Sequence, residues 1–199
     1  MAGSNAKVTR LLLLATVIIL TACARRAVPV PYHLSQDDKA LLRPGDIIMR
    51  RGEGTLSDMI VAALDDTLGV SHCGIVVCRG DSLAVIHCLS REVSDADGVQ
   101  ICSLDKFTSE SVPGSIIAVR CTSDTLLYMA SSAEYYLRTG RPFDKKFDVA
   151  DSSAFFCSEL PLIILKEKLN INLCKSDRKI PFSVFFNPKY FKIVLNHPK

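Results

Sequence analysis

Two short segments of the sequence carry residue types that together perform nucleophilic chemistry. His72 lies in the apolar run 71–77, which predicts a strand, and Cys157 lies in the segment 156–160, which predicts the start of a helix. A thiol at a helix N-terminus beside an imidazole on a strand is the minimum set of groups for cysteine-dependent hydrolysis. We therefore treat Cys157 as the candidate nucleophile and His72 as the candidate base.

Pro161 indicates where the helix after Cys157 begins. Because proline has no N–H, it is tolerated in the first turn of a helix, where the donors lack intrahelical partners. We therefore expect Cys157 at or next to the N-cap, where the helix dipole and free amides favour a thiolate. The backbone amides of Cys157 and Ser158 are the expected oxyanion donors. The open alternative is a buried, inert cysteine.

The second candidate histidine follows from the predicted hairpin after His72. A four-residue loop over 78–81 places His72 opposite His87, and strand alternation puts both side chains on one face. We expect His87 to hydrogen-bond the second ring nitrogen of His72 and so fix its tautomer and orientation. Gly74 leaves space beside His72 for a helix end. A one-residue change in the turn would put the two histidines on opposite faces.

The N-terminus is typical of an export signal. Lys7 and Arg10 precede the apolar run 11–22, which is shorter than the roughly 20 residues of a membrane span. Its end, Leu20-Thr21-Ala22-Cys23, resembles the lipobox of bacterial lipoproteins, in which cleavage precedes the cysteine. We predict a signal peptide over 1–22, lipidation of Cys23 and a membrane-anchored location in the cell envelope. An ordinary cleaved signal and a buried N-terminal helix are the alternatives.

Composition excludes some classes of partner. Removing residues 1–22 takes away Lys7 and Arg10 and no acid, so the formal charge falls from +3 to +1 (3 − 2 = 1). A nearly neutral chain without a basic cluster is not typical of nucleic-acid binding. There is no C-x-x-C pair, so we expect no metal site, and we expect no cofactor. An odd number of cysteines follows Cys23, which leaves at least one unpaired within an exported chain. They are Cys73, Cys78, Cys88, Cys102, Cys121, Cys157 and Cys174.

The remaining chain is long enough for one domain with a sizeable core. Residues 23–40 contain Pro29 and Pro31 and no sustained periodicity, so we predict a lipidated tether there and a single domain over 41–199. The apolar tail 180–195 is expected to pack on this domain. Strands are predicted at 46–50, 70–78, 83–88, 99–102 and 115–120, and helices at 56–64, at 125–139 and after Cys157 to about 170.

In this order, the segments resemble the YiiX-like, circularly permuted branch of the NlpC-type papain-like cysteine hydrolases, in which the histidine precedes the cysteine. The resemblance covers about 41–194 and implies a permuted papain-like α+β fold, with an antiparallel sheet packed against helices. It also implies a Cys-His-polar triad on Cys157, His72 and His87. The matching pieces are Gly45-Asp46-Ile47-Ile48, Ser71-His72-Cys73-Gly74-Ile75-Val76, Val85-Ile86-His87, Arg141-Pro142-Phe143-Asp144 and Phe156-Cys157-Ser158-Glu159-Leu160.

The sequence departs from that branch at two positions. The branch often has a carboxylate where His87 stands and a tyrosine where Phe143 stands, so substrate choice or activity is expected to differ. Glu159 is assigned no catalytic part, since its charge beside the thiolate would raise the thiol pKa. Asp46 and Asp144 are expected to be turn or cap residues.

These observations lead to one preferred function and two alternatives. The preferred function is a lipid-anchored cysteine hydrolase of the cell envelope that cleaves an amide or peptide bond in a cell-wall peptide or small amide. The first alternative is a lipid-directed thiol acyltransferase or acyl hydrolase. The second is a ligand-binding lipoprotein that has lost turnover. The sequence leaves the substrate and the oligomeric state open.

Overall fold

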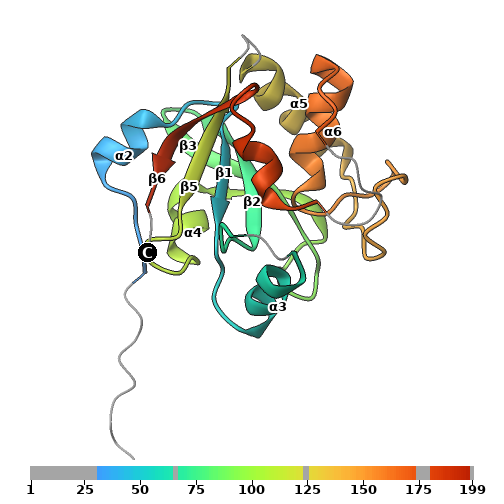
Figure 1. Ribbon diagram of the computed structural model, residues 1–199, viewed down its shortest axis with the longest axis horizontal. Helices are drawn as coiled ribbons and strands as arrows, with labels where there is room; N and C mark the ends of the chain where they lie inside the picture. Colours follow the sequence, from blue (N-terminus) through green and yellow to red (C-terminus); the bar gives the residue numbers. More distant parts are fainter. Residues whose placement is uncertain (1–30, 65–66, 123–125, 174–179, 198–199) are drawn as a thin grey trace, which may run out of the picture. The chain divides into compact units, whose positions relative to one another are not determined.

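A six-stranded antiparallel sheet forms the centre of the computed structural model, which describes residues 31–64, 67–122, 126–173 and 180–197 (Figure 1). The predicted signal peptide, Cys23 and Cys174 lie outside these ranges. No helix within them is long and apolar enough to cross a membrane. The strand order is β4-β3-β2-β1-β5-β6. The strands are β1 (Ile47–Arg50), β2 (His72–Arg79), β3 (Ser82–Leu89), β4 (Gly98–Ser103), β5 (Ile117–Cys121) and β6 (Phe191–Asn196).

The two faces of the sheet pack against different helices. One face carries Cys73 and Ile75 and packs against α5 (Leu126–Thr139), α6 (Glu159–Leu169) and the 3₁₀-helix η1 (Phe182–Phe186). The opposite face packs against α4 (Leu104–Ser109) and against residues that flank α2 (Gln36–Leu41). The remaining helix is α3 (Thr55–Leu64). Because side chains alternate along β2, His72 lies on the α4 face and its neighbour Cys73 lies on the α5–α6 face.

The tether is shorter than predicted, because the described domain begins before residue 41. Helix α2 lies inside the predicted tether, and Ser35 and Asp38 form a capping box at its N-terminus. Leu34 is buried in the core of the α4 face. The sequence analysis missed this helix because its six residues are too few to show a helical period.

The β2–β3 turn is tighter than the predicted four-residue loop. Arg79 pairs with Ser82, so only two residues form the turn, and Gly80 there has a φ of 58°. Consequently His87 lies opposite Gly74 instead of opposite His72. The predicted register is wrong by two residues, which is one full side-chain period. The prediction that both histidines share one face is therefore correct despite the wrong register.

Asp46 forms a buried ion pair that fastens β1 to β5. Its carboxylate has no exposed surface and accepts hydrogen bonds from Arg120 Nε and Nη2 at 2.7 and 2.8 Å. Because Asp46→Ala leaves the Arg120 charge unpaired, we expect it to lower the free energy of unfolding by about 3–5 kcal/mol. Urea denaturation measures this change. Asp58→Ala, which breaks an exposed pair with Arg51, is the control and should cost about 1 kcal/mol or less. Equal effects of the two substitutions would contradict the prediction.

Candidate active site

Cys157 directly precedes the N-cap residue of α6, which is Ser158. Pro161 is the third residue of the helix and lies in its first turn, as the sequence predicts. Leu160 and Ile164 are fully buried against the sheet, so the start of the helix is held in place. The side chain of Cys157 is half-buried. The thiol therefore has a fixed position in a residue that is partly exposed.

The side chain that contacts Cys157 most directly is Cys73, a buried residue of β2. Its thiol donates a hydrogen bond to the Cys157 carbonyl oxygen at 3.2 Å. A hydrogen bond from the Cys73 side chain lowers the pKa of Cys157 below its ordinary value of 9.0, and burial opposes this change. The backbone amides of Cys73, Ser158 and Cys157 also lower it. The amides of Cys157 and Ser158, the expected oxyanion donors, are thus among the groups that favour the thiolate.

His72 and His87 form a buried, hydrogen-bonded pair. His72 Nε2 lies 2.8 Å from His87 Nδ1, and neither ring is more than 6% exposed. Burial lowers the pKa of His72 well below 6.5, helped by the charges of His87 and Arg50, and burial lowers that of His87 to about 3. Both imidazoles are therefore neutral at pH 7, and one donates to the other. This leaves Nδ1 of His72 outside the pair.

The histidine pair and Cys157 are linked indirectly, by the residue that follows His72 in β2. His72 and Cys73 are consecutive residues, and Cys73 contacts Cys157. Within the described residues, no hydrogen bond joins the Cys157 thiol to either histidine. Catalytic hydrogen bonds are often long before substrate binds. The catalytic roles of the three residues therefore stay predictions.

Arg50 and Phe107 complete the surroundings of the histidines, and the sequence analysis missed both. Arg50 lies opposite His72 across β1 and β2, and its guanidinium carbon lies 4.9 Å from the centre of the Phe107 ring. The same ring lies 5.7 Å from the His72 ring and 5.8 Å from the His87 ring. Arg50 also pairs with Glu110 at 3.0 Å, while its Nε is buried without a partner. Phe107 belongs to α4, a helix with no periodic signal, and Arg50 becomes recognisable only once the strand order is known.

Gly74 gives space to β3 and not, as predicted, to a helix end. A Cβ atom there would lie 2.4 Å from Val85 Cγ1, 2.8 Å from the Ile86 carbonyl oxygen and 3.0 Å from His87 Cβ. The backbone contact cannot relax by a side-chain rotation. We expect Gly74→Ala to destabilise the protein by about 1–3 kcal/mol and to displace His87. Chemical denaturation and the imidazole NMR signals test this, and wild-type values in both would contradict it.

The sequence analysis assumed a negative charge on Glu159, and its burial in the structure corrects that assumption. This side chain is 1% exposed, and its Oε2 accepts a hydrogen bond from the Phe156 amide at 3.3 Å. Burial raises its pKa to about 8, so the carboxyl group is mainly neutral at pH 7. The predicted charge penalty on the thiol is therefore small. Asp144 accepts hydrogen bonds from the amides of Lys146 and Asp148, so it orders the loop before Cys157, as expected for a turn residue.

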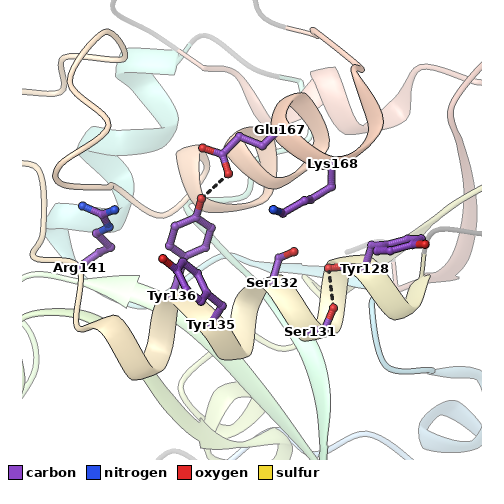
Figure 2. A pocket seen from close by; sticks show the side chains of 8 residues that line it. All are labelled: Tyr128, Ser131, Ser132, Tyr135, Tyr136, Arg141, Glu167 and Lys168. Atoms are coloured by element: carbon purple, nitrogen blue, oxygen red, sulfur yellow. Dashed lines mark hydrogen bonds between the residues drawn. The ribbon is translucent and has the colours of Figure 1, made fainter.

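A separate groove of about 520 Å³ lies between α5 and α6 (Figure 2). Across it, the Tyr136 hydroxyl donates to Glu167 at 2.6 Å. Arg141 and Lys168 face the groove without an ion-pair partner among the described residues. None of the predicted site residues lines it. The lining residues are Tyr128, Ser131, Ser132, Tyr135, Tyr136, Arg141, Glu167 and Lys168.

Comparison with known proteins gives matches among solved structures only at the level of the fold. No protein-family model matches the chain, and no curated protein does. Among solved structures, it resembles the crystal structure of metalloprotein YiiX from Escherichia coli O157:H7, with a TM-score of 0.64 and 16% sequence identity. The match covers 79% of this chain and 98% of that one. At this identity the likeness shows the fold alone, which is YiiX-like.

The word metalloprotein describes that neighbour. Within the described residues of this chain, no group of three or more histidine, cysteine or acidic side chains is arranged to hold a metal ion. Among the described residues, Cys73 and Cys157 form a pair without a third ligand, and the two histidines hydrogen-bond each other. These residues do not fit a metal centre, so no catalytic step is derived through a metal.

Proposed function

We propose that this protein is a cysteine hydrolase with a permuted papain-like site that cleaves amide or peptide bonds. One observation carries the proposal: a half-buried cysteine whose pKa is lowered lies at the start of α6, against the strand that begins with His72. The hydrogen bond between His72 Nε2 and His87 Nδ1 supports a triad of Cys157, His72 and His87. The YiiX-like fold agrees with the family resemblance of the sequence.

The proposed reaction has two halves, acylation of Cys157 and hydrolysis of the thioester, and His72 transfers a proton in both. Cys157 attacks the carbonyl carbon of the substrate, and the amides of Cys157 and Ser158 hold the oxyanion. His72 accepts the thiol proton at Nδ1 and transfers it to the leaving amine, while His87 holds the ring through Nε2. Because burial lowers the pKa of His72, its protonated form is a strong acid toward the leaving group. Water then attacks the thioester and gives a proton to His72, the C–S bond breaks, the carboxylic acid leaves, and the proton returns to the Cys157 sulfur.

We place this reaction in the cell envelope. The basic flank, the apolar run and the small residues before Cys23 support export and lipid anchoring. A cell-wall peptide or a small amide is then the expected substrate. Cell fractionation tests the location: the wild-type chain should be found with membranes, and Cys23→Ala should release it. Membrane association that does not depend on Cys23 would contradict the lipid anchor.

The proposed activity is tested with a library of peptides and small amides, using the full chain and intact-mass detection of an acyl group on Cys157. We expect His72→Gln to lower kcat/KM by about 10²–10⁴-fold, the usual contribution of a general acid–base residue. The matched control is His197→Gln, which removes a histidine that contacts Asp38 instead of the site. Equal activity of the two variants, with circular dichroism showing both folded, would contradict the role of His72.

A ligand-binding protein without turnover is the second candidate. It is favoured by the groove between α5 and α6 (Figure 2), where Arg141 and Lys168 have no ion-pair partner within the part of the chain that the structure describes. Phe143 in place of the usual tyrosine agrees with it. Under this alternative, Cys157→Ser binds the ligand as tightly as the wild type, and the wild type never carries an acyl group. Detection of the acyl intermediate on Cys157 would exclude it.

A further inference from the structure

Cys73 and Cys157 are neighbouring cysteines that differ in exposure. Cys73 has no exposed surface, whereas Cys157 is half-buried. The Cys73 thiol donates to the Cys157 carbonyl oxygen at 3.2 Å, which holds it beside the loop that presents Cys157. Cys157 is therefore the more exposed of the two residues, and the Cys73 thiol lies against its backbone.

We propose that Cys157 and Cys73 form a site of reversible oxidation, at which a hydroperoxide oxidises Cys157 and Cys73 then closes a disulfide. The consequence for catalysis rests on the proposed function, since the disulfide removes the nucleophile. The oxidation itself does not require turnover. The pair would thus act as an off-switch for the site.

The two steps balance without a further reactant. The Cys157 thiolate attacks one peroxide oxygen, the O–O bond breaks, and the alkoxide or hydroxide leaves and takes a proton. Sulfur is oxidised by two electrons to a sulfenic acid, and the peroxide is reduced to an alcohol or water. The Cys73 sulfur then attacks the Cys157 sulfur, an S–S bond forms, and hydroxide leaves with the Cys73 proton as water.

The electrostatics of the pair fit these roles. The hydrogen bond from Cys73 lowers the pKa of Cys157, so its thiolate, the form that reacts with peroxide, is favoured. Burial raises the pKa of Cys73 well above its ordinary value, so Cys73 stays a thiol until the sulfenic acid forms beside it. The attacking and resolving cysteines are thereby distinguished before any oxidant arrives.

Cys78, Cys88 and Cys102 are worse placed than Cys73 as partners of Cys157. Cys78 lies five residues along β2 from Cys73, roughly 16 Å away, and points to the opposite face. Cys102 pairs with Val85 and therefore lies on the α4 face with the histidines. Cys88 lies on the correct face, but its thiol donates to the Phe155 carbonyl oxygen at 2.9 Å. Cys73 is thus the expected partner, with Cys88 as the competitor to test.

The experiment treats the reduced full chain with hydrogen peroxide, blocks remaining thiols and maps the peptides by mass spectrometry. We expect a Cys157–Cys73 disulfide, two hydrogens lighter than the reduced pair, that dithiothreitol reverses. Cys73→Ser keeps a hydrogen-bond donor but no thiol, so it should accumulate a sulfenic acid on Cys157 that dimedone traps. The matched control Cys78→Ser should form the same disulfide as the wild type.

Two outcomes would overturn the inference. One is a wild-type Cys157 that proceeds to sulfenic or sulfinic acid while Cys73 stays reduced, and the other is a disulfide from Cys157 to Cys88. Amide hydrolysis is measured separately on the reduced chain. A chain that forms the disulfide without hydrolysing any amide contradicts the proposed function alone. A chain that hydrolyses amides but forms no disulfide contradicts the redox site alone.

Discussion

Replacing Cys157 by alanine is expected to lower the rate of amide hydrolysis by about 10³-fold or more, because Cys157 is the residue that forms the proposed thioester. The substitution removes one sulfur from a half-buried position, so the fold should survive. Initial rates with the best substrate from the library measure the effect, and circular dichroism confirms folding.

The control for this substitution is Cys78→Ala. Cys78 is an exposed free thiol near the end of β2, the strand that begins with His72. Its removal should therefore leave the rate unchanged. A Cys157→Ala protein that keeps more than a tenth of the wild-type rate would show that another residue is the nucleophile. Hydrolysis by the variant would also contradict the ligand-binding alternative, which has no turnover.

Below pH 6.5 we expect the buried histidine pair to destabilise the protein. The pKa of His87 is about 3 in the folded chain and that of His72 is also well below 6.5, so the unfolded chain binds more protons as the pH falls. The contribution of these two neutral histidines to the free energy of unfolding is complete above pH 6.5. It is lost as the pH falls toward 3. The expected slope is about 1.4 kcal/mol per pH unit for each histidine.

Glu159 acts in the opposite direction, so the test compares variants. Its pKa is raised to about 8, so the folded chain holds this proton more tightly than the unfolded chain between about pH 4.5 and 8. Its contribution to stability therefore falls as the pH rises through that window.

Urea denaturation of the wild type and of His87→Gln between pH 4 and 7 isolates the contribution of one histidine. The variant slope should be smaller by about 1.4 kcal/mol per pH unit. Identical slopes, or an NMR titration of His87 near 6.5, would contradict the account.

Much of the fold is predictable because its elements have strong local signals. The helix after Cys157 begins where Pro161 indicates, and the apolar tail packs on the sheet, where its last part forms β6. The hairpin prediction placed His72 and His87 on one face although its register was wrong. It succeeded because strand alternation has a period of two and the error was also two residues.

The surroundings of the site were less predictable, because they depend on contacts between distant segments. Cys73 has the sequence environment of a small core residue, and only the approach of the loop before α6 makes it the partner of Cys157. Phe107 lies on α4, which is too short for a periodic signal, and it packs on both histidines. Arg50 becomes a neighbour of His72 only through the pairing of β1 with β2. Each of these residues required the strand order, which local patterns do not specify.

The measurement that tests the central claim most directly is the alkylation rate of each cysteine in the reduced full chain across pH, read by mass spectrometry. We predict that Cys157 reacts first, with a midpoint below the free-thiol pKa of about 8.5, and that Cys73→Ala raises this midpoint because the hydrogen-bond donor is lost. Cys88 and Cys102, whose pKa values burial raises, should react last. If Cys157 reacts no faster than the exposed Cys78 at every pH, Cys157 is not a poised nucleophile and the proposed hydrolase is wrong.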